Sequence, residues 1–360
     1  MKKLGILTGG GDAPGLNAVI RAAVQTALNV YDCEVFGIRN GYDGFLEDDG
    51  IVPLGHEEVR GILPRGGTIL GSANRGNPYA RKVIRDGKEV TVDVSDEIIK
   101  GIKKLKLEAL LVLGGDGTLH IAHELFEKGV PIIGVPKTID NDIGGTEVTF
   151  GFDTALNIAT EALDRLHTTA ESHHRAMVLE LMGRDAGFIA LQAGISGGAD
   201  VILIPEIPFK FESIMAKIHE RADKGRKFSI LAVSEGAKSK DGVQVFSRKG
   251  DEIYVPRLGG IGQVVGEYIE KQGFESRVTV LGHIQRGGTP TAFDRSLATR
   301  YGAAAVRLAA RGGLDRMVAL HCGRITDIPL EEATAIPKRV KLDDDAVITA
   351  RNVGISFGDE

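Results

Sequence analysis

Asp116 lies in a glycine-rich stretch that reads Leu113-Gly114-Gly115-Asp116-Gly117-Thr118. Glycines let a backbone approach a phosphate closely, and the N-terminus of a following helix offers free N–H groups to it. A carboxylate in such a turn would repel phosphate unless a cation stood between the two, and Mg²⁺ binds both kinds of oxygen. The stretch therefore indicates a phosphate site with Mg²⁺ held by Asp116. The simpler alternative is a strand-to-helix turn whose Asp caps the helix.

Two further stretches contain groups that suit phosphoryl transfer. The loop Gly9–Gly11 has no large side chain, which suits a phosphate held by backbone N–H groups. In an extended segment, Thr138, Asp140 and Asp142 would point to one side. There they would bind a metal or supply a base for a sugar hydroxyl. The simpler alternative for this segment is an Asp-rich turn that caps its own backbone.

A phosphorylated acceptor needs a pocket of positive charge, and arginine makes paired contacts with phosphate. Ligands bind at the C-terminal ends of strands in open α/β sheets, so cations near strand ends are favoured over ordinary surface charges. The candidates near predicted strand ends are Arg175, Arg184, Arg277, His283 and Arg286. Glu235 follows another predicted strand and would hydrogen-bond sugar hydroxyls, although an exposed turn acid explains it equally well.

These groups belong to an alternation of predicted strands and helices. A strand over 4–8, a helix from Leu16 and a strand over 33–38 begin a doubly wound sheet. The turn that carries Asp116 joins an apolar strand over 109–113 to a helix over 119–126. A second alternation begins after residue 150, with predicted strands over 176–181, 201–204, 228–233, 277–281 and 316–321. The chain is therefore expected to be an α/β protein.

Composition excludes several classes of protein. The chain has 360 residues, of which 42% are hydrophobic and 26% charged, as in a folded globular protein. A net charge of −5 with no Trp and 5% aromatic residues speaks against nucleic-acid binding. No stretch approaches the length of a membrane span, and the apolar run Leu4–Leu7 is too short for a signal peptide. With only Cys33 and Cys322, the chain has no disulfide framework, and we expect it in the cytoplasm.

The chemical stretches resemble, in order and over nearly the whole chain, the motifs of the phosphofructokinase family, specifically bacterial 6-phosphofructokinases. The matching stretches are Gly10–Asn17, Gly114–Thr118, Thr138–Asp142, Gly151–Ala155, Met182–Arg184, Ile204–Glu206 and Leu281–Gly288. The resemblance implies two doubly wound α/β domains with the active site between them. It implies a nucleotide domain over 1–150 plus about 260–315, and a fructose 6-phosphate domain over about 151–259 plus 316–360.

The resemblance also implies roles for individual residues. Asp140 would take the proton from the 1-hydroxyl of fructose 6-phosphate, while Thr138 and Arg184 stabilise the transferring group and Asp116 binds Mg²⁺. The implied donor site is Gly10, Gly11, Tyr42, Arg75, Gly115, Asp116, Gly117, Thr118 and Lys137. The implied substrate site is Thr138, Asp140, Asp142, Arg175, Met182, Gly183, Arg184, Glu235, Arg277, His283 and Arg286. In the family, the arginines that match Arg175 and Arg277 come from a neighbouring subunit, which implies a homo-oligomer, commonly a tetramer.

Two markers of the phosphoryl donor disagree. Family members that use ATP usually have Gly after the metal-binding Asp, as at Gly117, whereas those that use pyrophosphate usually have Asp there. Pyrophosphate enzymes have Lys at the position of Lys137. A glycine leaves space for the rest of a nucleotide, while the lysine excludes nothing, so we expect ATP, with pyrophosphate as the alternative. Arg75 is displaced by one position from the family arginine that bridges the two substrates.

Control by an effector is a separate expectation. Arg21, Lys224 and Arg226 match cations of the family's effector site, but Gln25 replaces an arginine and Asp200 a glutamate.

Two alternatives to a phosphofructokinase stay open at this point. NAD kinases and lipid kinases share the turn around Asp116, but they are not expected to carry the segments 138–142 and 282–288 together. A non-catalytic sugar-phosphate or nucleotide sensor would be marked by loss of Asp116 or Asp140, and both are present.

Overall fold

The computed structural model describes residues 1–72, 77–85, 88–242, 246–248 and 257–360. The chain forms two compact units, one of residues 1–153 with 286–337 and the other of residues 154–285 with 338–360. Each unit contains its own mainly parallel sheet covered by helices, so the predicted α/β fold is confirmed.

The first unit is built on a seven-stranded sheet with the order β15-β14-β7-β6-β1-β2-β3. Its strands are β1 (Lys3–Thr8), β2 (Glu34–Ile38), β3 (Ile51–Pro53), β6 (Ala109–Gly114), β7 (Ile132–Pro136), β14 (Arg316–His321) and β15 (Arg324–Pro329). The five central strands are parallel, and β3 and β15 pair antiparallel at the two edges. A buried parallel sheet needs apolar residues on both faces, which explains the continuous apolar runs of β6 and β7.

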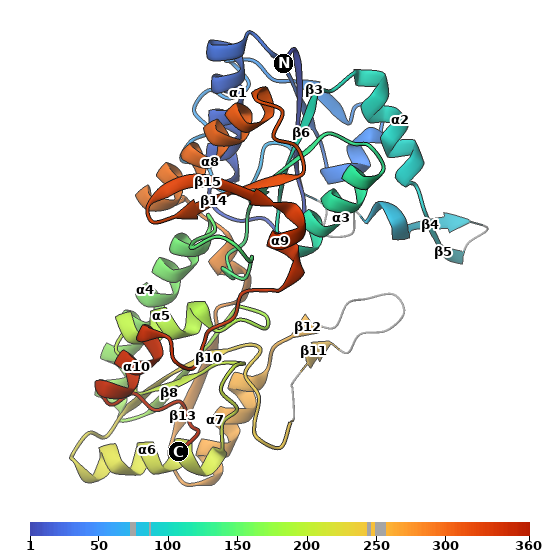
Figure 1. Cartoon of the computed structure of the whole chain (residues 1–360). Coiled ribbons are helices and arrows are strands. Elements are labelled where there is room, and N and C mark those ends of the chain that lie inside the picture. The colour runs from blue at the N-terminus through green and yellow to red at the C-terminus, as the bar shows by residue number, and fades with distance from the viewer. Residues whose placement is uncertain (73–76, 86–87, 243–245, 249–256) are drawn as a thin grey trace. The chain divides into compact units, whose positions relative to one another are not determined.

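Successive residues of β6 face opposite helix layers. Leu111 and Leu113 join the core under α1 (Leu16–Tyr31) and α8 (Ala292–Ala310), which lie side by side in Figure 1. Leu110 and Val112 join a second core with α2 (Ser95–Leu105), α3 (Asp116–Glu127) and α9 (Leu330–Ala335). Because successive side chains of a strand point to opposite faces, β6 is buried under helices on both sides.

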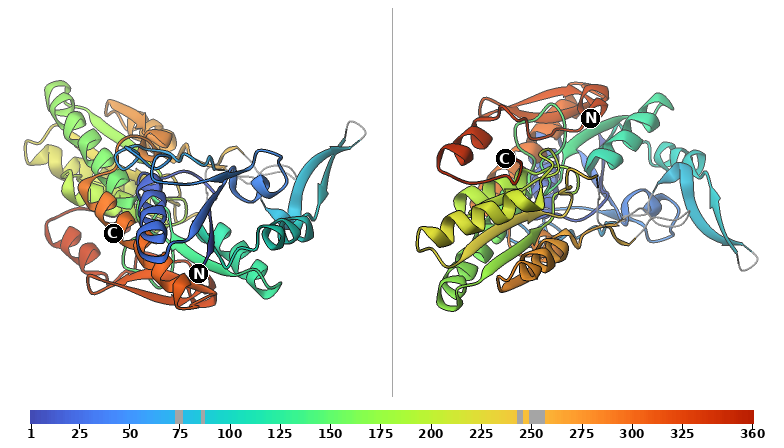
Figure 2. Two further views of the ribbon diagram at one scale, coloured as in Figure 1. Left: turned by 90° about the horizontal axis from the view of Figure 1, so that it is seen from above. Right: turned by 90° about the horizontal axis from the view of Figure 1, so that it is seen from below.

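Shorter elements complete the first unit. They are the 3₁₀ turns η1 (Gly41–Phe45) and η2 (Pro78–Ala80) and the hairpin of β4 (Arg81–Arg85) with β5 (Lys88–Val92). Figure 2 shows that this hairpin extends away from the rest of its unit.

The second unit has a four-stranded parallel sheet with the order β13-β8-β10-β9. Its strands are β8 (Ala176–Leu181), β9 (Val201–Leu203), β10 (Ser229–Ser234) and β13 (Ser276–Val280). The helices are α4 (Phe152–His173), α5 (Phe188–Ser196), α6 (Phe211–Asp223), α7 (Ile261–Lys271) and α10 (Asp345–Asn352). A small ribbon joins β11 (Phe246–Arg248) to β12 (Arg257–Leu258), and η3 spans Gly282–Arg286.

Helices cover both faces of this sheet as well. Residues of α6 and α7 bury one face together with Val178, Leu203 and Leu231. On the other face α5 packs closely against β9 and β10, because Gly194 has no side chain and a Cβ there would lie 2.5 Å from Ile202. In the part of the chain that the structure describes, no helix is long and apolar enough to cross a membrane.

The compact units differ from the predicted domain boundaries. β13 pairs with β8, so residues 260–285 belong to the second unit instead of the first. β14 pairs with β7, so residues 316–337 belong to the first unit. The order of strands along the chain does not reveal which sheet each strand joins, because that choice is made by pairing partners far apart in sequence.

Candidate active site

The glycine turns that follow β1 and β6 meet at the side chain of Thr118. Gly9 N donates to Leu113 O at 2.9 Å, which holds the first loop beside the end of β6. A Cβ at Gly9 would lie 2.6 Å from Thr118 Cγ2, and one at Gly114 would lie 2.4 Å from Thr118 Cβ. Both positions therefore require glycine, and Gly10 adopts a left-handed φ of +75° that also favours it.

Three consecutive carbonyls of the first loop accept hydrogen bonds from side chains. Gly10 O accepts from Ser72 Oγ at 2.5 Å, Gly11 O from Lys137 Nζ, and Asp12 O from an Arg286 guanidinium nitrogen at 3.2 Å. Within the described residues, the N–H groups of Gly11 and Asp12 make no hydrogen bond. The loop is thus fixed through its carbonyls while these N–H groups stay available for an anion.

Lys137 lies between the two glycine turns. Its side chain is buried, with 3% of the residue exposed, and its own N–H donates to Gly114 O at 3.0 Å. Burial lowers the pKa of Lys137 to about 8, and the Arg286 charge acts in the same direction. The Asp140 and Asp12 carboxylates oppose this decrease in pKa. The Lys137 ammonium is therefore mostly charged at neutral pH, but it loses its proton at a lower pH than an ordinary lysine does.

Asp116 begins helix α3, directly after Gly115. The side chain of Asp116 is half-buried, and Gly117 beside it is exposed. A Cβ at Gly117 would have no atom within 4 Å. The predicted open space next to the carboxylate is therefore present in this unit.

The segment Thr138–Asp142 is not extended, so the predicted alternation of its side chains is wrong. Asn141 has a left-handed φ of 55°, and Asp140 N donates to Thr138 Oγ1 at 3.0 Å in a tight turn. Thr149 holds this turn by donating from its N–H to Asn141 Oδ1 at 3.1 Å and from its hydroxyl to Thr138 O at 2.8 Å. Asp140 is 3% exposed, while Asp142 is half-buried. The Thr138 hydroxyl and the two carboxylates are therefore positioned by a bend in the backbone, and not by the alternation of side chains along a strand.

In the second unit, Met182, Arg184 and Glu235 lie together at the C-terminal edge of the sheet. Glu235 N donates to Leu181 O at 2.7 Å, and Arg184 N donates to Glu235 Oε1 at 3.2 Å. Gly183 between them has φ +144°, and a Cβ there would lie 2.5 Å from Ala186 O. The predicted grouping of these residues is therefore present.

Gln285 fastens the η3 segment to this edge, which the sequence analysis did not foresee. The side chain of Gln285 is fully buried, and its Oε1 accepts from Met182 N at 2.8 Å. His283, two residues earlier on η3, is exposed. The sequence offers only an amide side chain between His283 and Arg286. A polar residue in a predicted loop gives no sign that it is buried.

Arg175 and Arg277 lie at the opposite edge of the same sheet. Arg175 directly precedes β8, and Arg277 is the second residue of β13. Both pair with Glu275, at 2.7 Å and 2.8 Å. A strand of about six residues rises roughly 20 Å, so in this chain these two arginines do not join Arg184. The predicted position at C-terminal strand ends is therefore wrong for Arg175 and Arg277.

Two predicted donor residues are placed differently or not described. Tyr42 is 3% exposed and packs in the apolar core with Ile98 and Ile102, where burial raises the pKa of its hydroxyl. Its side chain is therefore part of the core. Arg75 lies outside the described residues.

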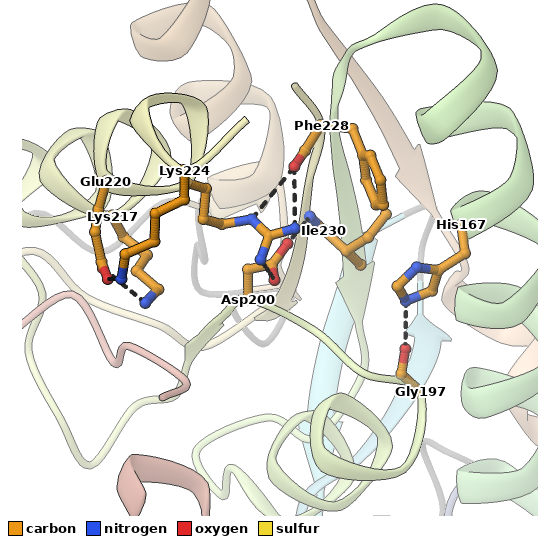
Figure 3. A network of polar contacts seen from close by, with 9 residues as sticks. His167, Gly197, Asp200, Lys217, Glu220, Lys224, Phe228 and Ile230 are labelled. Carbon is orange, nitrogen blue, oxygen red and sulfur yellow. Dashed lines mark hydrogen bonds and ion pairs between the residues drawn. The ribbon is translucent and has the colours of Figure 1, made fainter. Parts of the chain in front are cut away.

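Two of the residues at effector-site positions, Lys224 and Asp200, are paired within the second unit. Asp200 pairs with Arg221 at 2.6 Å and accepts from Ile230 N at 2.9 Å, while Lys224 pairs with Glu220 (Figure 3). Burial raises the pKa of Asp200. The charges of Lys224 and Asp200 are therefore compensated inside the chain.

A metal at this site would depend on ligands beyond the protein. Within the described ranges, no three His, Cys, Asp or Glu side chains form a group that could hold a metal ion. Mg²⁺ commonly binds through one or two carboxylates, water and substrate phosphates, so a single half-buried Asp116 beside a phosphate cradle fits that ion and not a closed structural site.

Glycine turns, carboxylates and a buried lysine at the ends of parallel strands are typical of α/β proteins that bind phosphorylated ligands. Residues 3–309 match the family described as phosphofructokinase, and the chain belongs to that family.

Relatives with two different donors match the chain over its full length. It is 52% identical over 360 residues to the ATP-dependent 6-phosphofructokinase of Chloroflexus aggregans, covering 100% of this chain and 98% of the relative. It is 50% identical over 359 residues to the pyrophosphate–fructose 6-phosphate 1-phosphotransferase of Streptomyces coelicolor, covering 99% and 100%. Identity alone therefore does not separate the two donors.

The structure is also similar to that of Pichia pastoris phosphofructokinase in the T-state. The TM-score is 0.80 with 32% sequence identity, over 93% of this chain and 35% of that chain. The present chain thus spans about a third of the length of that structure.

Proposed function

We propose that this chain is a glycolytic, Mg²⁺-dependent 6-phosphofructokinase that transfers the terminal phosphoryl group of ATP to the 1-hydroxyl of fructose 6-phosphate. The products are fructose 1,6-bisphosphate and ADP. One observation carries the proposal: a buried carboxylate, Asp140, follows β7 while the glycine turn with Asp116 follows the adjacent strand β6. The base for an alcohol and the cradle for a phosphate thus belong to neighbouring strand ends.

In this reaction Asp140 accepts the proton of the attacking 1-hydroxyl. The surrounding turn holds the carboxylate in place, because Asp140 N is bound to Thr138 Oγ1 and Thr138 O to Thr149. The Thr138 hydroxyl and the Arg184 guanidinium are assigned to the charge that develops on the transferring group. Phosphoryl transfer is mostly positioning and charge neutralisation, so a rigid turn suits the base.

The donor phosphates are assigned to the loop of Gly10 and Gly11, the turn at Gly115 and Thr118, and Lys137. Fixed carbonyls and available N–H groups in the first loop support an anion site. Mg²⁺ would be held by Asp116 and would neutralise charge on the donor phosphates. The assignment of ATP is supported by the open space at Gly117.

Fructose 6-phosphate is assigned to the C-terminal edge of the sheet in the second unit, where Met182, Arg184 and Glu235 lie together. Arg184 and His283 supply charge, Met182 and Glu235 contact the sugar, and Gly183 permits the sharp turn between them. The family resemblance also assigns Asp142 and Arg286 to this substrate.

We further propose that active sites are shared between subunits of a homo-oligomer, such as a tetramer. Arg175 and Arg277 lie a strand length away from Arg184 in their own chain, so they serve a sugar phosphate bound to a neighbouring copy. Free cysteines at 33 and 322 agree with the expected cytoplasmic setting.

The assignment of the base is tested with Asp140→Ser in an assay of fructose 1,6-bisphosphate formation. We expect kcat to fall by a factor of about 10³ with little change in the affinity for fructose 6-phosphate, because the base acts in the transition state. Thermal unfolding of the variant serves as the control for folding. Normal turnover by folded Asp140→Ser would refute the assignment.

A further inference from the structure

A second cationic site lies in the first unit, on surface that the proposed reaction does not use. A cavity of about 450 Å³ lies between α8 and the turn that joins β14 to β15. Its lining includes Arg300, Arg307 and Arg324, together with Thr299 and Ile325. None of these residues was assigned to ATP or fructose 6-phosphate.

The arginines converge because of helix and hairpin geometry. Arg300 and Arg307 are seven residues apart on α8, so they lie on one helix face, about 10 Å apart along its axis. Arg324 begins β15 and faces them from the hairpin. Between residues 295 and 314 the sequence has four arginines and no acidic residue, although the whole chain has a net charge of −5.

Carboxylates do not neutralise these three cations. In the described part of the chain, Arg300, Arg307 and Arg324 form no ion pair. The nearby Arg311 and Arg316 both pair with Asp327, so the one acidic side chain of the hairpin is already used. The cavity lining therefore carries three arginines that no carboxylate pairs with in the described part of the chain.

The hairpin turn holds one wall of the cavity rigid. Cys322 and Gly323 have φ values of 47° and 72°, as in a two-residue turn with both central residues left-handed. Arg300 donates to Gly323 O at 2.6 Å, and Cys322 N donates to Glu147 Oε1 at 2.7 Å. The turn is thus fixed by two hydrogen bonds, and one of them also orients an arginine of the cavity.

We propose that this cavity binds a small molecule that carries at least two phosphate groups. Guanidinium groups spread over about 10 Å match two separate anionic groups, and 450 Å³ is within the range of small-molecule sites. The turn follows the C-terminal end of β14, where open α/β sheets bind ligands. The negative net charge of the whole chain favours a small anion over a nucleic acid.

The proposal is tested by isothermal titration of the full-length protein without fructose 6-phosphate. Inorganic pyrophosphate, ATP and fructose 1,6-bisphosphate are titrated separately, since each carries the required phosphates. We expect at least one of them to bind wild type with one more equivalent per chain than the triple variant R300Q/R307Q/R324Q binds. The ligand that shows the extra equivalent identifies the source of the phosphates.

Single replacements sharpen the result. R307Q alone should weaken the extra site about tenfold, because one charge-assisted contact is lost. The control R60Q removes an exposed positive charge outside the cavity, one that pairs with Glu57, and should leave the site intact. If the triple variant does not fold, R307Q carries the test, since within the described residues the Arg307 side chain makes no hydrogen bond.

The KM values for both substrates provide a separate readout and should not change in the triple variant. Equal stoichiometry of wild type and triple variant for all three ligands would overturn the proposal. An equal loss of affinity in R60Q would also overturn it, because the effect would then be one of general charge.

Discussion

Gly117 is typical of family members that use ATP, and Lys137 of those that use pyrophosphate. The two residues differ in burial and contacts. Gly117 is exposed with empty space around it, whereas Lys137 is buried and bound to a loop carbonyl. A buried lysine that braces the loop serves either donor, because both present phosphates there. The space at Gly117 matters only to a donor that extends beyond pyrophosphate.

Replacing Gly117 by Asp should therefore disable ATP. We expect kcat/KM for ATP to fall about a hundredfold, because a carboxylate next to Asp116 fills the space and repels the nucleotide phosphates. Folding should be preserved, since an acidic residue in the first turn of α3 favours the helix. Gly117→Ala is the matched control and should retain most activity. Unchanged ATP kinetics in Gly117→Asp would contradict the account of donor choice.

Lys137 predicts a dependence of ATP binding on pH. Its pKa is lowered to about 8, chiefly by burial, so the ammonium charge is present below that pH and lost above it. KM for ATP should therefore rise as the pH increases through about 8. Lys137→Met should have a high KM for ATP at every pH and lack this rise, as measured from initial rates between pH 6.5 and 9. A rise of the same size in Lys137→Met would assign the titration to another group.

At the scale of elements, loops tied to strand ends build the proposed site. The strand over 109–113 and the helix after Asp116 could be predicted because apolar runs and glycine turns are local signals. The bend at Asn141 could not, because its left-handed backbone depends on hydrogen bonds from Thr149, eight residues later. Sequence periodicity describes regular elements, whereas catalytic loops are shaped by such tertiary contacts.

Gln285 offers a test of one such contact. Gln285→Leu removes the acceptor for Met182 N and frees η3 from the end of β8. We expect KM for fructose 6-phosphate to rise about tenfold while KM for ATP stays unchanged. The lost hydrogen bond fixes residues assigned to the sugar phosphate and none assigned to ATP. Steady-state kinetics with each substrate varied in turn measures this split. Equal effects on both KM values would indicate a general loss of folding instead.

The link between α3 and the segment before β14 should make stability depend on pH. His123 Nδ1 lies 2.9 Å from Asp315 Oδ1, and this hydrogen bond raises the pKa of His123. A raised pKa in the folded state means that the stabilisation is complete below the ordinary pKa of histidine, near 6.5, and is lost as the pH rises through the raised value.

Asp315→Asn should remove this pH-dependent part, about 1 kcal/mol. Asn tolerates the left-handed backbone of this position, where φ is 53°, so the substitution tests the charge and not the turn. Urea unfolding at pH 5.5 and pH 8.5 gives the comparison. A difference between wild type and variant that is the same at both pH values would contradict the role of the His123 charge.

For the whole molecule, the α/β class and most strands could be predicted from the sequence, but the sheets that two of the strands join could not. β13 pairs with β8 and β14 pairs with β7, and both partners lie more than 90 residues earlier in the chain. No local sequence pattern predicts these pairings. Arg175 and Arg277 were grouped with Arg184 by strand ends, although Arg175 precedes the predicted strand over 176–181 and Arg184 follows it. For Arg277, the parallel pairing of β13 with β8 places it at the same edge as Arg175.

The proposed sharing of active sites predicts complementation between two inactive variants. Asp140→Ser lacks the base, and the double variant Arg175→Ser/Arg277→Ser lacks the cations offered to a neighbour. After the two proteins are unfolded together and refolded as a mixture, activity should return, since mixed oligomers contain sites with both parts intact. Refolding each variant alone is the control. If the mixture is no more active than its components, these arginines do not serve a neighbouring copy.

We propose above that this chain phosphorylates fructose 6-phosphate with ATP. The most direct measurement is the initial rate of fructose 1,6-bisphosphate formation with Mg²⁺, once with ATP and once with pyrophosphate. The account predicts a rate with ATP and none with pyrophosphate. A rate with pyrophosphate alone would contradict the assignment of the donor and give Lys137 more weight than the space at Gly117. No rate with either donor would contradict the proposed reaction.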